Sequence, residues 1–512
     1  MRTKYSMINM IFGVGGHVLN MVLAFVSRMI FIRYLDAAYL GVSGLFSDIL
    51  GMLNLAELGI GSAMIFSMYK PAALDDREQL GKLMNLYKLM YRLVAVFVLA
   101  AGLCLLPFLD VLIKGDPGIE HLRLIYLMYL GNSVSSYLLS YKNSILLAYQ
   151  KAYVRTVVEQ IAHAVQIILQ VVVLIVTQNF LLYLLLQILT QISINLVVSR
   201  RVDKEFPYLK DEKRLPSKEE RSGIMKNILA LSMHRLGSAV VNSTDNLLMS
   251  AFVGLTSVGI YSNYKLVIKS LGDLLNKVYT AFTGSIGNLG ATQDPEYIYR
   301  IYKQLDFFLF LLFGYFSAGM VVLFNPFIKL MFGEEYLFSQ AVVIIVVVQF
   351  YITGMRQINL QFREAMGLFW YDRYKPVAES IINLVVSILL VQRYGVAGVF
   401  LGTIVSTMTT CFWVEPYILM KYGLKEQWQE KLRDYFIEYG RRALTVVGGS
   451  IVGLCFTGGM RDSFLWFILK GILFTVEYAA LIFLTYGRSE EFEALLEHGK
   501  NFLKQRLDRK KT

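Results

Sequence analysis

The stretch YSNYKLVIKSLGDLLNK, residues 261–277, carries charges at a fixed spacing within an apolar helical pattern. Lys265, Lys269, Asp273 and Lys277 recur at every fourth position, which places them on one face of a helix. Most residues between them are leucine, isoleucine or valine. The pattern predicts a helix with one apolar and one charged side. Such a helix either spans a membrane with its charges against protein or water, or lies on the membrane surface.

The composition of the whole chain places this helix in a membrane protein. Of the 512 residues, 56% are hydrophobic and 17% are charged, whereas a soluble domain carries about 25% charged residues. The net charge of +12 reflects loop orientation in a membrane protein, and we expect no nucleic-acid partner. Cys104, Cys411 and Cys455 all fall in apolar segments, a pattern that indicates neither a disulfide framework nor a metal cluster.

Long apolar segments separated by charged breaks predict about fourteen membrane-spanning helices. The sequence therefore indicates an all-α integral membrane protein. The predicted spans are residues 7–32, 40–69, 93–109, 122–148, 153–176, 180–199, 224–253, 258–282, 307–330, 341–366, 374–391, 396–419, 443–456 and 464–486.

Lysine and arginine are concentrated in alternate connections between these spans, including the linker that follows residue 199. The positive-inside rule then places both termini in the cytoplasm. The same asymmetry favours a spanning helix at residues 258–282, because every later loop would otherwise change sides. We therefore expect a multi-pass membrane protein.

Two pairs of similar segments indicate an internal repeat. EQIAHAVQIIL, which begins at Glu159, resembles ESIINLVVSIL, which begins at Glu379, and YLGV at Tyr39 resembles SVGI at Ser257. An even number of helices per half predicts a parallel pseudo-two-fold repeat with a binding cavity between the halves. The predicted parts are an N-terminal six-helix lobe (1–200), a cytoplasmic linker (201–222), a C-terminal six-helix lobe (223–420), and two extra helices with a basic tail (421–512).

Ionisable residues inside the predicted spans are informative, because each costs about 2.5–3.5 kcal/mol at a helix centre. They gather mainly in the first two helices of each half, where a central cavity would need them. Some have a structural alternative: Arg28 could reach the outer surface, and Asp48 and Glu57 could be ion-pair partners. The predicted substrate-binding residues are Arg28, Arg235, Lys265, Lys269, Lys277 and Arg356, and the predicted charge-balancing or ion-coupling residues are Asp48, Glu57, Asp245 and Asp273.

Sequence motifs for nucleotide hydrolysis and for other catalysis are absent. Lys82 follows Gly81, but the remaining positions of a phosphate-binding loop do not match. Metal-protease, paired CxxC and nucleophile-elbow motifs are also missing. We expect no enzyme activity and no cofactor, so transport would be passive or driven by an ion gradient or the membrane potential.

Several segments together resemble the polysaccharide flippases of the multidrug/oligosaccharidyl-lipid/polysaccharide exporter superfamily, in their Gram-positive-type branch. They are SRMIFIRYLDAAYLGVSGLFSDILG (27–51), LAELGIG (55–61), HRLGSAVVNSTDNLLMSAFVG (234–254) and VGIYSNYK (258–265). The likeness covers nearly the whole chain and implies a MATE-like fold. In the more distant lipid II flippases an acid follows a late arginine of the first helix. Arg28 fits that pattern, but Met29 stands where the acid would be.

The resemblance implies a substrate and partners. The substrate would be an undecaprenyl-pyrophosphate-linked oligosaccharide repeat unit, moved to the outer leaflet for capsule, exopolysaccharide or cell-wall polysaccharide biosynthesis. Membrane lipids, a polysaccharide polymerase and glycosyltransferases are the expected partners. The alternatives are a lipid II flippase, a cation-coupled multidrug or metabolite antiporter that uses Asp48, Glu57 or Asp245, and a scaffold without transport activity.

Overall fold

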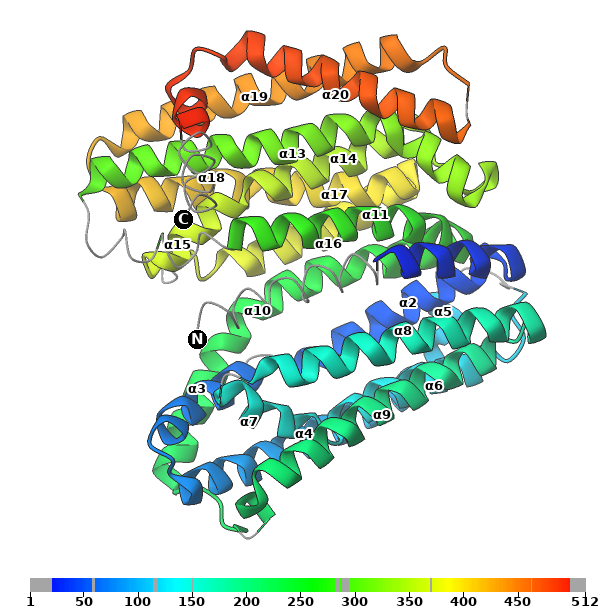
Figure 1. The fold of residues 1–512 in the computed structure, drawn as a ribbon, viewed down its shortest axis with the longest axis vertical. Coiled ribbons are helices and arrows are strands. Elements are labelled where there is room, and N and C mark those ends of the chain that lie inside the picture. Colours follow the sequence, from blue (N-terminus) through cyan, green and yellow to red (C-terminus); the bar gives the residue numbers. More distant parts are fainter. Residues whose placement is uncertain are drawn as a thin grey trace, which may run out of the picture. The chain divides into compact units, whose positions relative to one another are not determined.

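The computed structural model describes residues 21–57, 60–113, 118–149, 151–210, 212–280, 286, 294–368, 371–461 and 463–497. Every regular element in these ranges is a helix, which confirms the predicted all-α class. Contacts within the chain divide it into two compact units, Met1–Gly259 and Ile260–Thr512 (Figure 1). The predicted boundaries of the lobes, the linker and the two extra helices stay predictions.

The first unit begins, in its described part, with a helix over residues 21–34. The elements that follow are α2 (Ala37–Leu53), the 3₁₀ turn η1 (Asn54–Glu57), α3 (Ile60–Ala73), α4 (Arg77–Leu105), η2 (Leu106–Phe108), α5 (Leu109–Leu112), α6 (Leu122–Tyr137), η3 (Ser140–Lys142), α7 (Asn143–Ala148), α8 (Ala152–Thr177), α9 (Phe180–Glu205), η4 (Pro207–Lys210) and α10 (Lys218–Phe252).

The second unit takes up most of α11 (Leu255–Thr280), which begins in the first unit. Its long helix α13 packs against α14, α19 and α20 (Figure 1). The elements are α13 (Pro295–Phe332), η5 (Glu334–Tyr336), α14 (Gln340–Met355), α15 (Gln357–Ala365), α16 (Lys375–Tyr394), α17 (Val396–Thr409), α18 (Cys411–Ile418), the π-helical turn η7 (Leu419–Leu424), α19 (Trp428–Thr457) and α20 (Phe464–Tyr486).

Eight helical segments in the described ranges are long and apolar enough to cross a membrane, and α2 is a shorter apolar helix. The helices α10 and α11 are not among the eight, although α10 has 35 residues and α11 has 26. These two helices carry ionisable residues through much of their length. A helix of that kind can cross a bilayer only where protein or water covers its charges.

Local sequence explains where several helices begin. The carboxylate of Asp76 accepts a hydrogen bond from the first turn of α4, and the amide of Asn179 does the same for α9. Ser217 and Glu220 form a reciprocal capping box at the start of α10. Each bond satisfies a backbone N–H that has no partner within the helix.

Two predicted spans are interrupted in the structure. The predicted helix 40–69 is split by η1, and the predicted helix 122–148 is split between α6 and α7 by η3. Both breaks contain polar side chains: Asn54 Oδ1 accepts from the hydroxyl of Ser133 at 3.1 Å, and the hydroxyl of Ser140 donates to the carbonyl oxygen of Tyr137 at 3.4 Å. Each break places polar groups within an otherwise apolar segment.

Two glycines allow a close backbone crossing at the start of α2. A Cβ atom on Gly41 would collide with the carbonyl oxygen of Leu255, and a Cβ atom on Gly259 would collide with the carbonyl oxygen of Ala37. These glycines occupy the third position of YLGV and of SVGI, the two segments that indicated a repeat. Only glycine permits backbones to approach so closely.

Candidate functional site

The helix α11 has two chemically different faces, as its sequence predicted. Val267 and Leu271 line an apolar groove, whereas Lys269 and Asp273 form an ion pair of 3.3 Å on the charged face. At 3.6 residues per turn, the two faces lie about 160° apart around the helix axis. The side chains of Lys269 and Asp273 are 71% and 43% exposed. The charged face is therefore open, while the apolar face is covered.

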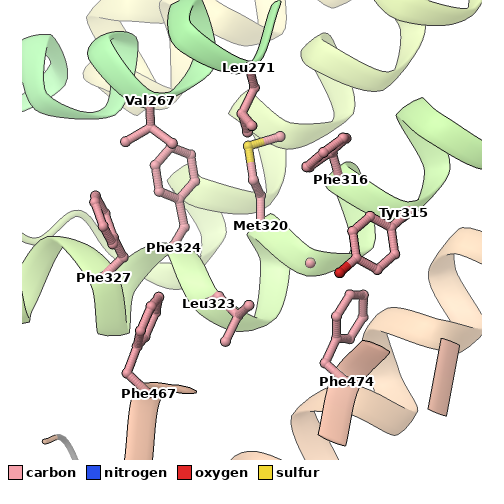
Figure 2. A pocket seen from close by; sticks show the side chains of 11 residues that line it. Val267, Leu271, Tyr315, Phe316, Met320, Leu323, Phe324, Phe327, Phe467 and Phe474 are labelled. Carbon is pink, nitrogen blue, oxygen red and sulfur yellow. The ribbon is translucent and has the colours of Figure 1, made fainter. Parts of the chain in front are cut away.

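The groove is formed by α11, α13 and α20 and has a volume of about 210 Å³. Figure 2 shows Val267 and Leu271 projecting from α11 towards side chains of α13, with Phe467 and Phe474 at the opposite wall. Its one lining hydroxyl, on Tyr315, lies 2.8 Å from the hydroxyl of Thr475. A groove with this lining suits a hydrocarbon chain, because no polar group in it would be left without a partner.

The other predicted basic residues of the cavity are placed as follows. Lys265 is half-buried on the charged face of α11 and has contacts of its own. Arg28 has Tyr129 and Tyr183 as electrostatic neighbours, so it lies against α6 and α9 within the first unit. The side chains of Arg235 and Lys277 lie outside the described part of the structure.

A polar cavity of about 480 Å³ lies within the first unit. Polar groups from five helices (α4, α6, α7, α8 and α9) and from both interrupting turns converge on it. The lining residues are Asn54, Glu57, Gly61, Ile65, Tyr87, Tyr91, Ser136, Tyr137, Ser140, Asn143, Ser144, Leu147, Arg155 and Gln191.

Glu57 is held in this cavity by hydroxyl groups. The hydroxyl of Tyr91 donates to Glu57 Oε1, the hydroxyl of Tyr87 donates to that of Tyr91 at 3.0 Å, and Tyr137 also bonds Glu57. The cationic group nearest in the lining, Arg155, pairs instead with Glu159 at 2.5 Å. The carboxylate is thus held by neutral donors beside an open volume, an arrangement that can take up a cation or a proton.

Asp48 and Asp245 belong to a different place in the same unit. The amide of Asn246 on α10 donates to Asp48 Oδ2 at 2.7 Å, which joins α2 to α10. Asp245, the neighbour of Asn246, is 8% exposed. Neither aspartate lines the cavity around Glu57, so the predicted acids of the first unit do not form one cluster.

Arg356 lies in a network of charged groups in the second unit. Its guanidinium donates two hydrogen bonds to Glu415, at 2.8 and 3.0 Å, and lies 3.5 Å from Glu379. Lys375 bonds the same Glu415 and also Asp372. Because Arg356 is already engaged by carboxylates, the function proposed below does not use it as an anion ligand.

Sequence reasoning missed the groups that complete these sites. Glu415 lies near the end of the predicted span 396–419, where an acid is expected to reach the membrane surface. Tyr91 lies just before the predicted span 93–109 and Tyr137 lies within the span 122–148, and neither was predicted as a site residue. The interval of four between Tyr87 and Tyr91 was the available signal, because it places two hydroxyls on one helix face.

No protein-family model matches the chain, and no curated protein matches its sequence. Among solved structures, the lipid II flippase MurJ in an inward closed conformation is similar, with a TM-score of 0.63 and 14% identity over 93% of this chain and 99% of that one. An inward-facing multidrug resistance MATE family transporter of the MOP superfamily has a TM-score of 0.62, with 17% identity over 80% of this chain and 96% of that one. A mutant of the Vibrio cholerae MATE transporter VcmN has a TM-score of 0.52, with 15% identity over 84% and 99%. The chain has the fold of these membrane transporters. The predicted MATE-like fold is confirmed.

Proposed function

We propose that this chain is a flippase that moves a polyprenyl-pyrophosphate-linked oligosaccharide from the inner to the outer leaflet of a bacterial plasma membrane. The observation that carries the proposal is the two-sided helix α11, with an open lysine face and an apolar face against an aromatic groove. A lipid-linked oligosaccharide has the matching parts, an anionic headgroup and a hydrocarbon tail.

The energetic problem of such a substrate is its charge. Moving one bare ion into hydrocarbon costs on the order of 20 kcal/mol by the Born estimate. Lys265 and Lys269 on α11 would supply counter-charges to the headgroup and remove most of that barrier. Asp273, which pairs with Lys269, would reduce the positive electrostatic potential at this face, so that the anion can also dissociate.

The hydrocarbon tail must stay out of water while the headgroup crosses, and the apolar groove offers it a binding surface. Each CH₂ group kept out of water contributes about 0.8 kcal/mol. The groove of Val267 and Leu271 would hold the part of the tail nearest the headgroup while the rest stays in lipid. The substrate would then lie around α11, with its pyrophosphate on one face and its first isoprene units on the other.

The proposed setting is polysaccharide biosynthesis, with both termini in the cytoplasm and with a polymerase and glycosyltransferases as partners. The structural similarity to a lipid II flippase supports a lipid-linked substrate, and lipid II itself remains the neighbouring alternative. The transport cycle would be alternating access, in which a central cavity opens to one side at a time.

Flipping of a labelled polyprenyl-pyrophosphate oligosaccharide in reconstituted vesicles tests the proposal. Lys265→Gln with Lys269→Gln should reduce the rate at least tenfold while membrane insertion stays normal. Lys329→Gln, which removes a lysine outside α11 that pairs with Glu334, is the control.

A second variant pair tests the groove. Leu271→Trp fills it and should slow flipping. Leu274→Trp, on an exposed site of the same helix outside the groove lining, should not. Normal flipping in both the double-lysine and the Leu271 variants would overturn the proposal.

The cavity around Glu57 favours a second candidate function, a cation-coupled antiporter. A carboxylate held by hydroxyls beside about 480 Å³ of polar space is suited to a proton or a sodium ion. In that case transport would follow the ion gradient, Glu57→Gln would abolish coupling, and the double-lysine variant would transport organic cations normally.

A further inference from the structure

A separate basic cavity lies on the first unit, where Leu209 and residues 212–215 line a space beside α4 and η3. Its volume is about 620 Å³, and none of its lining residues lines the cavity of Glu57. Helix α4 contributes Lys88 and Arg92 to the wall, and the connecting segment contributes Lys213. The function proposed above assigns no role to this cavity.

The cavity has an excess of positive charge. Its two lining acids are engaged, since Asp203 pairs with Lys142 at 2.6 Å and Glu212 pairs with Arg214 at 2.9 Å. Lys88, Arg92 and Lys213 form no ion pair with any residue in the described ranges. Three cations therefore face one volume without a carboxylate to balance them.

The position of these cations along α4 matches the level of lipid headgroups. Arg92 is the last charged side chain before the apolar stretch 93–109. Leu89 and Leu93, one residue beyond Lys88 and Arg92, are 44% and 61% exposed. Residues one position apart point about 100° from each other around a helix. The basic strip thus runs beside a strip of exposed leucines that would face acyl chains.

The wall opposite α4 is fixed in place. The side-chain amide of Asn85 donates to the carbonyl oxygens of Glu212 and Arg214, at 2.8 and 3.2 Å. A Cβ atom on Gly81 would lie 2.6 Å from the Cβ of Glu212, so the segment packs directly on the backbone of α4. The cavity is consequently formed by ordered elements on both sides.

We propose that this cavity binds the phosphate group of an anionic phospholipid. Arg92 offers the planar donor pair that suits a phosphate, and Lys88 and Lys213 add charge. The acyl chains would lie along Leu89 and Leu93. The bound lipid would join residues 212–215 to α4 at the membrane interface, and a basic pocket at the end of spanning helices is a recurrent site for such headgroups.

Native mass spectrometry of the purified full chain, with equal amounts of phosphatidylglycerol and phosphatidylcholine, tests the proposal. We expect phosphatidylglycerol to be retained preferentially. Removing a cation near an anionic headgroup is worth about a fivefold change in retention, so Arg92→Gln and Lys88→Gln should each lower the preference by that factor. Arg200→Gln is the matched control, since Arg200 is exposed at the end of α9 and does not line the cavity.

Four outcomes support or overturn the proposed lipid site. Loss of the preference in the Arg92 and Lys88 variants, with the Arg200 variant unchanged, supports the site. Equal retention of the two lipids, or equal loss in all three variants, overturns it. Inorganic phosphate forms the last arm: if it displaces phosphatidylglycerol at millimolar concentration, the cavity is a site for free phosphate and the lipid assignment is wrong.

Discussion

Glu57 and Glu415 are both glutamates within predicted membrane spans, but their charges are compensated in different ways. Glu415 is completely buried between Arg356 and Lys375. Glu57 bonds the hydroxyls of Tyr91 and Tyr137 and borders an open polar cavity. A carboxylate fixed by two cations has no capacity for another positive charge, whereas one fixed by neutral donors retains it. The comparison indicates a structural role for Glu415 and an exchangeable site at Glu57.

The largest expected effect is on stability in the second unit. Glu415→Gln leaves Arg356 and Lys375 buried without their shared carboxylate, and breaking a buried pair costs about 3–5 kcal/mol. Thermal unfolding of the purified protein measures the loss. Adding Arg356→Gln should recover part of it, because the remaining charges again balance. A change below about 1 kcal/mol in the single variant would contradict the structural role.

A smaller loss of stability is expected when the hydroxyl partner of Glu57 is removed. Tyr91→Phe removes a hydrogen bond to a charged group, which contributes about 1.5–3 kcal/mol. Tyr87→Phe is the matched control, because it removes only a bond between two neutral hydroxyls, worth about 0.5–1.5 kcal/mol. Equal losses in the two variants would show that Glu57 is not charged in the folded protein.

Glu57→Gln should change stability by less than about 1 kcal/mol, since the amide oxygen can still accept from Tyr91. Transport is the informative measurement here. If Glu57 exchanges a cation, the variant should lose the dependence of transport on the proton or sodium gradient. A variant that unfolds like Glu415→Gln would place Glu57 in the same structural class and remove the distinction between the two sites.

The smallest change in stability is expected at Glu212, outside the predicted spans. The guanidinium of Arg214 lowers the pKa of Glu212 to about 2. A carboxyl with a lowered pKa stabilises the fold above its unfolded pKa of about 4.3, and this contribution is lost as the pH falls towards 2. The protection of residues 212–218 against hydrogen exchange, measured relative to the intrinsic exchange rate at each pH, should therefore fall between pH 5 and pH 2. Arg214→Gln should exchange faster already at pH 6, and identical rates in both proteins at pH 6 would contradict the pairing.

Much of the fold follows from hydropathy alone. The predicted spans 153–176 and 464–486 agree with α8 and α20 to within one residue at each end. The interruptions at η1 and η3 were not predicted, because the apolar residues on both sides of each turn keep the average hydropathy of the span high. Lipid exposure constrains the average composition of a span, but a local break depends on hydrogen bonds that an average does not contain.

The candidate sites were predicted less completely. The spacing of Lys265, Lys269 and Asp273 predicted the two faces of α11, since helical geometry relates residues four apart. The partners of Glu57 and Arg356 come from helices distant in sequence, and no spacing rule relates Glu57 to Tyr137 or Arg356 to Glu415. Tertiary packing decides such pairs, so a single sequence identifies the charges but not their compensation.

The crossing of Gly41 and Gly259 has the geometry of a symmetric subunit contact. Gly41 contacts Leu255, and Gly259 contacts Ala37. The two glycines are 218 residues apart in the sequence, and so are the two residues that they contact. In a two-fold homodimer, residue i of one subunit contacts j of its partner, and j contacts i in return. The same reciprocity within one chain is what gene duplication and fusion of a dimeric ancestor would leave. An ancestral half-length protein would then have needed glycine here once, and the fused chain carries the requirement twice.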